Sequence, residues 1–281
     1  MKLSDSTRLA YDDVGSGRAV VLLHGYPFDR SMWREQSDFL SAHGYRVVAP
    51  DLRGFGESSD KLQFVADAGG SHTRRQAEAC RTNATMSEMA LDVAALMDDL
   101  KIDRGVICGL SMGGYVAFEF VHLYPAKVSA LVLAGTRAPA DNEQEKQVRE
   151  QQAHRALANG MSGIAEATLP KLLARRTLAE KPDVVTRVRE MILRSDPRAA
   201  AAAQHGVAAR RDYSNDLSKI NLPAFVIVGR EDSIRPVSDA QFMHDRIPDS
   251  RLEIIEDAAH MTNMEQPEIF NDKVLKFLEK I

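Results

Sequence analysis

The chain has 281 residues, of which 44% are hydrophobic and 27% charged, and its formal net charge is −4. This composition is typical of a globular protein with a full hydrophobic core, and its interspersed charges argue against nucleic acid as a partner. Two cysteines without a CxxC pattern indicate neither a disulfide framework nor a cysteine metal site, and without a signal peptide or membrane-length apolar run we expect a cytoplasmic protein with no membrane partner.

Short apolar runs alternate with longer helical patterns from the N-terminus onward. This alternation is typical of a mainly parallel sheet covered by helices, in which strands buried on both faces are continuous apolar runs. We predict strands at residues 19–23, 46–49, 105–108, 130–133 and 224–228, with a weaker one at 252–255.

Helical patterns occupy the segments between these strands. A helix starts at Thr85, where Thr85 and Glu88 form a capping box in which each side chain accepts from the other residue's amide. Further helices are predicted at residues 31–43 and 112–124, with Pro125 ending the second, and a last helix closes the chain.

Two segments interrupt the alternation. Residues 60–84 are polar and too long for an ordinary connection, and we expect a mobile excursion there. Residues 137–218 have repeated helical periodicity and no strand signal. The predicted organisation is therefore an α/β core formed by residues 1–136 and 219–281, with a helical cap at 137–218.

Residues 109–113 read Gly-Leu-Ser-Met-Gly, directly after a predicted strand and directly before a predicted helix. This is the G-x-S-x-G pattern of a nucleophile elbow in its expected setting. The turn is so sharp that positions 109 and 113 pack against each other, which is why both are glycine. The strained backbone of Ser111 then exposes its hydroxyl above the sheet.

A serine hydroxyl needs a base to take its proton. His260 follows the last predicted strand and Asp232 follows the strand before it, so both emerge at the same sheet edge as Ser111. The predicted catalytic set is Ser111, Asp232 and His260, in the chain order of one known scaffold for this chemistry. Glu231 is the alternative to Asp232.

Acyl transfer also needs hydrogen-bond donors for the oxyanion. One predicted donor is the backbone amide of Met112, next after the nucleophile. The other is the amide of Tyr26, in the loop after the first buried strand, because Pro27 has no N–H. We expect His24 to brace this loop rather than to act in catalysis.

The sequence resembles the α/β-hydrolase superfamily over nearly its whole length, and within it the bacterial group of arylesterases, cofactor-free haloperoxidases (perhydrolases) and enol-lactone hydrolases. The segments that carry the resemblance are residues 24–27, 50–58, 109–114, 258–260 and 265–267. The resemblance implies an α/β-hydrolase fold, the same catalytic and oxyanion residues, and structural roles for Asp51, Arg53 and Gly56.

These observations predict a carboxylesterase-like serine hydrolase that cleaves a small ester or lactone, with no cofactor and no metal. Tyr26 and Arg137, which follows the strand leading into the cap, are candidate substrate-binding residues, and Arg137 would pair with a carboxylate. We also expect Met161, Leu172, Leu173 and His205 to line the pocket. A perhydrolase or carbon–carbon bond hydrolase with the same residues, and a non-catalytic ligand receptor, are the alternatives.

Overall fold

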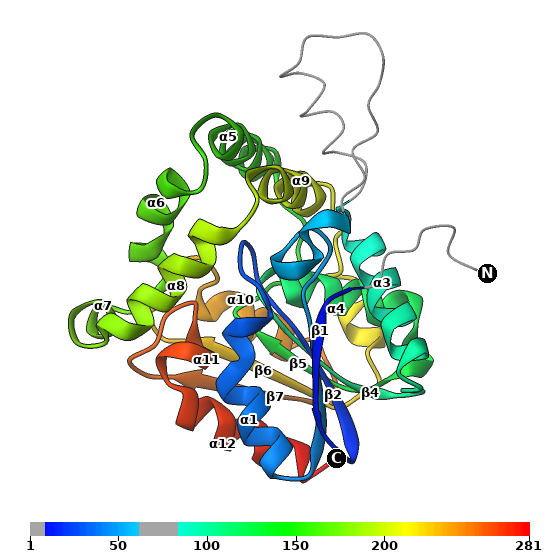
Figure 1. The fold of residues 1–281 in the computed structure, drawn as a ribbon. Helices are drawn as coiled ribbons and strands as arrows, with labels where there is room; N and C mark the ends of the chain where they lie inside the picture. The colour runs from blue at the N-terminus through cyan, green and yellow to red at the C-terminus, as the bar shows by residue number, and fades with distance from the viewer. Residues whose placement is uncertain (1–8, 62–83) are drawn as a thin grey trace, which may run out of the picture.

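The computed structural model describes residues 9–61 and 84–281, and its centre is a seven-stranded sheet with the order β1-β3-β2-β4-β5-β6-β7 (Figure 1). β1 is antiparallel to β3, and the other strands run parallel. The predicted α/β class is confirmed. The strands are β1 (Tyr11–Gly15), β2 (Arg18–Leu23), β3 (Tyr45–Pro50), β4 (Gly105–Leu110), β5 (Val128–Ala134), β6 (Ala224–Gly229) and β7 (Ser250–Ile255).

Each of the six predicted strands lies inside an observed one, from β2 to β7. β1 was not predicted, because its five residues are all exposed and have no apolar pattern. β1 pairs with β3 alone and buries neither face, so its backbone hydrogen bonds form without an apolar pattern in its side chains.

Helices cover both faces of the sheet, and successive side chains of β2 belong alternately to the hydrophobic cores on the two faces. Val21 and Leu23 belong to the core formed with α3 and α4, whereas Val20 and Leu22 belong to the core formed with α1 and α12 (Figure 1). The helices that precede or follow the strands of the α/β core are η1 (Arg30–Trp33), α1 (Arg34–Ala42), η2 (Gly56–Lys61), α3 (Met86–Asp99), α4 (Met112–Leu123), η3 (Pro125–Lys127), η4 (Leu217–Lys219), α10 (Val237–His244), α11 (Thr262–Glu265) and α12 (Pro267–Leu278).

The predicted helix starts and ends are close to those observed. The capping box of α3 is confirmed, since Thr85 and Glu88 accept from each other's backbone amides. The helix predicted at 31–43 divides into η1 and α1, and the one predicted at 112–124 is α4, ending at Leu123.

Five further helices lie between β5 and β6, within residues 137–218, where the sequence predicts helices and no strand. They are α5 (Glu143–Asn159), α6 (Ser162–Leu172), α7 (Arg175–Glu180), α8 (Pro182–Arg194) and α9 (Pro197–Ala208). α9 packs closely on the core at Gly206, where a Cβ atom would lie 1.9 Å from the carbonyl oxygen of Ala84. The absence of a side chain there lets α9 touch the backbone that leads into α3.

The predicted excursion at residues 60–84 lies outside the described residues, apart from its two ends. Among the described residues, no helix is long and apolar enough to cross a bilayer, and no cluster of His, Cys, Asp or Glu has an arrangement that would hold a metal ion.

We predict that Gly206→Ala lowers the free energy of unfolding by about 1–3 kcal/mol, because the added methyl group forces α9 away from a backbone oxygen that has no room to move. Gly163→Ala in α6 is the matched control, since a Cβ there meets no atom within 4 Å. It should stabilise the protein by up to about 1 kcal/mol through helix propensity. Guanidinium unfolding of both variants measures this, and equal stability of the two would contradict the contact.

Candidate active site

The carboxyl ends of the parallel strands bring together residues that are far apart in sequence. β2, β4, β5, β6 and β7 are consecutive neighbours in the sheet. The loops that follow them carry Tyr26, Ser111, Gly135, Asp232 and His260 respectively. In open α/β sheets this edge is where ligands bind.

Ser111 occupies a sharp turn between β4 and α4, with φ 54° and ψ −111°. A Cβ at Gly109 would lie 2.2 Å from the carbonyl oxygen of Gly113, and a Cβ at Gly113 would lie 2.1 Å from that of Leu23. The packing of positions 109 and 113 agrees with the reason predicted for their glycines, and the structure adds the contact with Leu23. A non-glycine residue at positive φ is strained and needs support from its surroundings.

Two hydrogen bonds supply that support. The Ser111 amide donates to the carbonyl of Ala134 (2.9 Å), at the end of β5. The Thr136 hydroxyl donates to the Ser111 carbonyl (2.9 Å). The backbone of the turn is thereby held from the neighbouring strand, and the serine side chain takes no part in these bonds.

His260 and Asp232 form a buried pair, with Nδ1 of the imidazole 2.7 Å from Oδ2 of the carboxylate. The other oxygen, Oδ1, accepts from the amides of Ile234 and Arg235, each at 2.8 Å. A carboxylate only accepts, so Nδ1 carries a proton, and in a neutral imidazole the lone pair is then on Nε2. Glu231, the predicted alternative, is instead within 3.2 Å of the Arg175 amide in α7.

The segment of His260 is tied to the inserted helices. The amides of His260 and Met261 both donate to the carbonyl of Leu172, at 3.0 and 3.2 Å. The buried carboxylate of Glu265 accepts from the Ala259 amide (2.8 Å) and from the Ala174 amide (2.6 Å). One carboxylate thus joins the histidine loop to the junction of α6 and α7.

Ser111 and His260 line one cavity of about 580 Å³, which is within the usual range for small-molecule sites. Tyr26, Pro27 and Met112 line it beside them. Burial raises the pKa of Tyr26 to about 12, so its phenol stays neutral at physiological pH. The remaining lining residues are Tyr115, Gln144, Glu145, Val148, Arg149, Gln151, Gln152, Arg155, Ala167, Thr168, Lys171, Leu172, Gln204, Val207, Ser233, Ile234 and Arg235.

The roof of the cavity is the polar face of α5. Its lining residues at positions 144, 145, 148, 149, 151, 152 and 155 follow helical spacing, and Ala153 and Ala156 are the buried residues of the same helix. Sequence reasoning missed these residues, because a polar helix face has the same pattern whether it meets solvent or a cavity.

Most of the residues at 137–218 that were predicted to line the cavity do not line it. Of these predicted residues, all of which the structure describes, Leu172 alone lines the cavity. Met161 and Leu173 are buried in the core. His205 pairs with Glu150 of α5 at 3.1 Å. The guanidinium of Arg137 pairs with Asp141 (2.6 Å) and Glu145 (2.8 Å) and lies behind the lining, so the structure does not place it against a substrate.

His24 has the bracing position that the sequence suggested. Its Nε2 accepts from the Leu52 amide (2.8 Å), so Nδ1 carries the proton and donates to the Gly25 carbonyl (2.9 Å). Burial lowers the pKa of His24, which keeps the ring neutral. Asp51 of the next loop accepts from the amides of Arg30 and Glu57, both at 2.8 Å. These contacts fix the loop that carries Tyr26.

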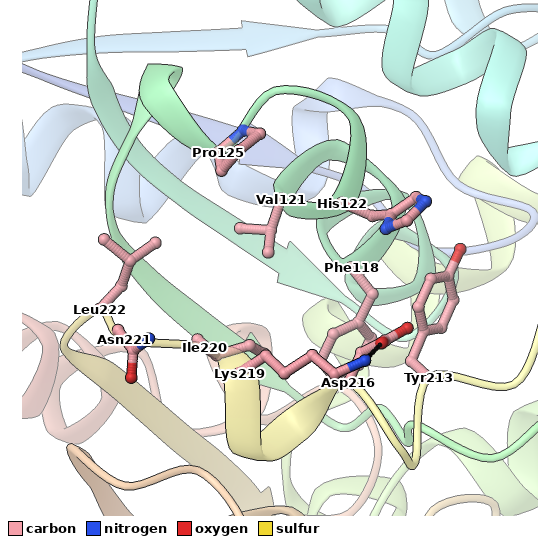
Figure 2. Close-up of a pocket in the computed structure, with 10 residues that line it drawn as sticks. All are labelled: Phe118, Val121, His122, Pro125, Tyr213, Asp216, Lys219, Ile220, Asn221 and Leu222. Atoms are coloured by element: carbon pink, nitrogen blue, oxygen red, sulfur yellow. Dashed lines mark hydrogen bonds and ion pairs between the residues drawn. The ribbon is translucent and has the colours of Figure 1, made fainter.

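A second cavity, of about 370 Å³, lies at the other end of α4. Figure 2 shows it between Phe118 and Val121 of that helix and the segment at residues 213–222, where Asp216 and Lys219 are paired at 2.8 Å. Its described lining contains no serine or cysteine. The candidate site for chemistry is therefore the cavity of Ser111 and His260.

A family model described as the alpha/beta hydrolase fold matches residues 18–267. The chain therefore belongs to the α/β-hydrolase family, as the resemblance of its motifs implied.

Three similar proteins illustrate the range of the family. A solved thermophilic esterase from Thermogutta terrifontis, with malate bound, is 38% identical, with a TM-score of 0.86 over 97% of this chain and 93% of its own. A 3-oxoadipate enol-lactonase of Acinetobacter baylyi is 27% identical over 91% of this chain and 86% of its own length. A bromoperoxidase from Bacillus anthracis, at 24% identity with a TM-score of 0.82 over 96% of this chain and 95% of its own, shares the fold.

We predict that Glu265→Gln lowers the free energy of unfolding by about 1–3 kcal/mol, because one of two buried amides loses its acceptor. Burial raises the pKa of Glu265, so its contribution to stability is present at low pH and is lost as the pH rises through the folded-state pKa. The deficit of the variant should therefore grow as the pH falls from 7 towards the ordinary glutamate value. Denaturant unfolding at several pH values measures it.

The control for this substitution is Glu268→Gln, an exposed glutamate in the first turn of α12. It should change stability by at most about 0.5 kcal/mol. Equal and pH-independent effects of the two substitutions would contradict the assigned role of Glu265.

Proposed function

We propose that the protein is a serine hydrolase that cleaves a small carboxylic ester or lactone through an acyl-serine intermediate. The observation that carries the proposal is the His260–Asp232 pair, 2.7 Å apart, in the cavity that Ser111 also lines. The esterase and the enol-lactonase among the similar proteins support hydrolysis of this bond type.

In the proposed first half-reaction, Ser111 Oγ attacks the carbonyl carbon while His260 Nε2 takes its proton. The carbonyl oxygen becomes an oxyanion, which the backbone amides of Met112 and Tyr26 stabilise. Met112 is suited to this because the first amides of a helix have no helical partner and lie at the positive end of its dipole. The intermediate then collapses, and the alcohol oxygen leaves with the proton from His260.

The second half-reaction repeats these steps with water. His260 takes a proton as the water oxygen attacks the acyl carbon, and then returns it to Ser111 Oγ when the acid departs. Asp232 accepts from Nδ1 throughout, which keeps Nε2 facing the reaction and stabilises the imidazolium that forms. In a lactone the leaving alcohol remains part of the product.

In this proposal the helical segment at 137–218 is a cap that closes the cavity over the substrate. Tyr26 is in contact with the substrate. The polar face of α5 and the connection of Leu172 to the histidine loop support the role of the cap. No step of the reaction needs a cofactor.

We expect Ser111→Ala to lower kcat by about 10⁶-fold while the protein stays folded, because the nucleophile is lost. Hydrolysis of 4-nitrophenyl esters and simple lactones of graded acyl length measures the loss. The wild type, and not the variant, should react with a fluorophosphonate probe. Retention of more than a few per cent of the activity would contradict the assignment of Ser111.

Asp232→Asn should lower kcat by about 10⁴-fold, because an amide stabilises the wrong imidazole tautomer and cannot balance the imidazolium charge. Glu231→Gln is the matched control, since the neighbouring carboxylate faces Arg175 rather than the imidazole. Its kcat should stay within about threefold of the wild type, corresponding to less than about 0.7 kcal/mol. A larger loss in Glu231→Gln than in Asp232→Asn would reverse the choice of acid.

A further inference from the structure

Positive charge predominates in the cavity of Ser111. Four of its lining residues have basic side chains, Arg149, Arg155, Lys171 and Arg235, and the one acid among its described lining residues is Glu145. The Glu145 carboxylate is paired at 2.8 Å with Arg137, which does not line the cavity, and this pairing lowers its pKa. The cavity thus offers a substrate several cations and an anion that is already neutralised.

Arg235 is held in a fixed orientation on the cavity wall. It is 7% exposed, its Nε donates to the Tyr115 hydroxyl (2.8 Å), and its Nη1 donates to the Ile234 carbonyl (2.6 Å). Among the described residues its Nη2 has no hydrogen-bond partner. Hydrogen bonds at Nε and Nη1 hold the guanidinium plane in place, and Nη2 remains available to donate to an anion.

Arg149 reaches the cavity from α5. Its Nε donates to Asp141 (2.9 Å) and its Nη1 to the Gln204 side chain of α9 (3.2 Å), and no described residue bonds its Nη2. Asp141 also pairs with Arg137 and Arg210, at 2.6 and 2.8 Å. Two carboxylates, Asp141 and Glu145, pair with the three guanidiniums of Arg137, Arg149 and Arg210, which leaves one positive charge unbalanced.

Both arginines line the cavity together with Tyr115 of α4, whose hydroxyl accepts from Arg235. Burial alone would raise the pKa of Tyr115, yet four nearby arginines, Arg235 foremost and Arg149 among them, lower it. Tyr115 lies four residues after Ser111 on α4, which at the helical rise is about 6 Å further along the axis. Tyr115 therefore lies about one helical turn from the nucleophile, and a carboxylate held near its hydroxyl shares the cavity with a carbonyl carbon at Ser111.

We propose that Arg149 and Arg235 form a binding site for a free carboxylate of the substrate. The esters or lactones hydrolysed are then those whose acyl part carries a free carboxylate, and glutarate, with three methylene groups between its carboxyl groups, is the probe. This inference rests on the proposed function for the identity of the cleaved bond. The preference for a carboxylate rests on the two arginines alone.

The test compares two esters of nearly equal shape, monoethyl glutarate and ethyl 5-methylhexanoate, in which an isopropyl group replaces the carboxylate. The wild type should prefer the glutarate ester in kcat/KM. Arg149→Gln and Arg235→Gln should each reduce the preference about 10- to 100-fold, as expected for a charge-assisted hydrogen bond. Hydrolysis of the neutral ester should fall much less, and an unchanged preference in both variants overturns the proposal.

Two further variants distinguish a direct hydrogen bond to the carboxylate from the long-range electrostatic attraction of the cavity's positive charge, and from a folding defect. Arg155→Gln removes an exposed cation on the same helix and should change the preference less than about threefold, with the change vanishing in high salt. Arg149→Lys keeps the charge without the planar fork and should lose less preference than Arg149→Gln. Equal losses in Arg149→Lys, Arg149→Gln and Arg155→Gln overturn the assignment.

A binding measurement separates failure of the anion site from failure of the proposed reaction. Calorimetric titration of glutarate into Ser111→Ala should show saturable binding that weakens at least about tenfold when Arg149→Gln or Arg235→Gln is added. Glutarate binding without ester turnover by the wild type would leave the anion site standing and refute the hydrolase. Turnover of the neutral ester without glutarate binding refutes the anion site alone.

Discussion

The turn at Ser111 is the constraint on which the site depends. The serine adopts a left-handed backbone that costs about 1–3 kcal/mol, and bonds to Ala134 and Thr136 hold it there. α4 can begin immediately after it only because Gly113 lies against the carbonyl of Leu23 with no space for a methyl group. The same close approach brings the end of β2, and with it the loop of Tyr26, beside the first amide of α4.

Features set by neighbours in the chain were predictable from the sequence. A strand buried on both faces must be apolar along its length, so β2 to β6 were found, whereas β7, with one buried residue, has a weaker pattern. The Thr85–Glu88 capping box needs only the three-residue spacing. The meeting of Asp232 and His260 was predictable for a topological reason, because loops after parallel strands share an edge. The choice between Glu231 and Asp232 depended on side-chain direction, which the structure supplies: Glu231 faces α7.

Features set by packing between distant segments were not predictable. Arg137 follows β5 as expected, but Asp141 and Glu145 lie close enough in the chain to draw its guanidinium away from the cavity. Arg149 and Arg235 belong to no motif. Both line the cavity of Ser111 because α5 contributes to its lining, and the sequence contains no local signal for the position of α5. β1 was missed for the opposite reason, since its exposed side chains contribute nothing to a core.

The carbonyl of Leu172 has a consequence for how the scaffold diversifies. Because it accepts from both His260 and Met261, the inserted helices are part of the frame that orients the imidazole and are not an independent module. Exchange of the segment at 137–218 between homologous chains is therefore restricted at its contacts with the histidine loop. A transplanted segment must bring an acceptor to the place of Leu172 and an amide to the place of Ala174, or the recipient's histidine loop loses its anchor. Sequence drift is correspondingly freer on α5, whose roof residues can change without disturbing that frame.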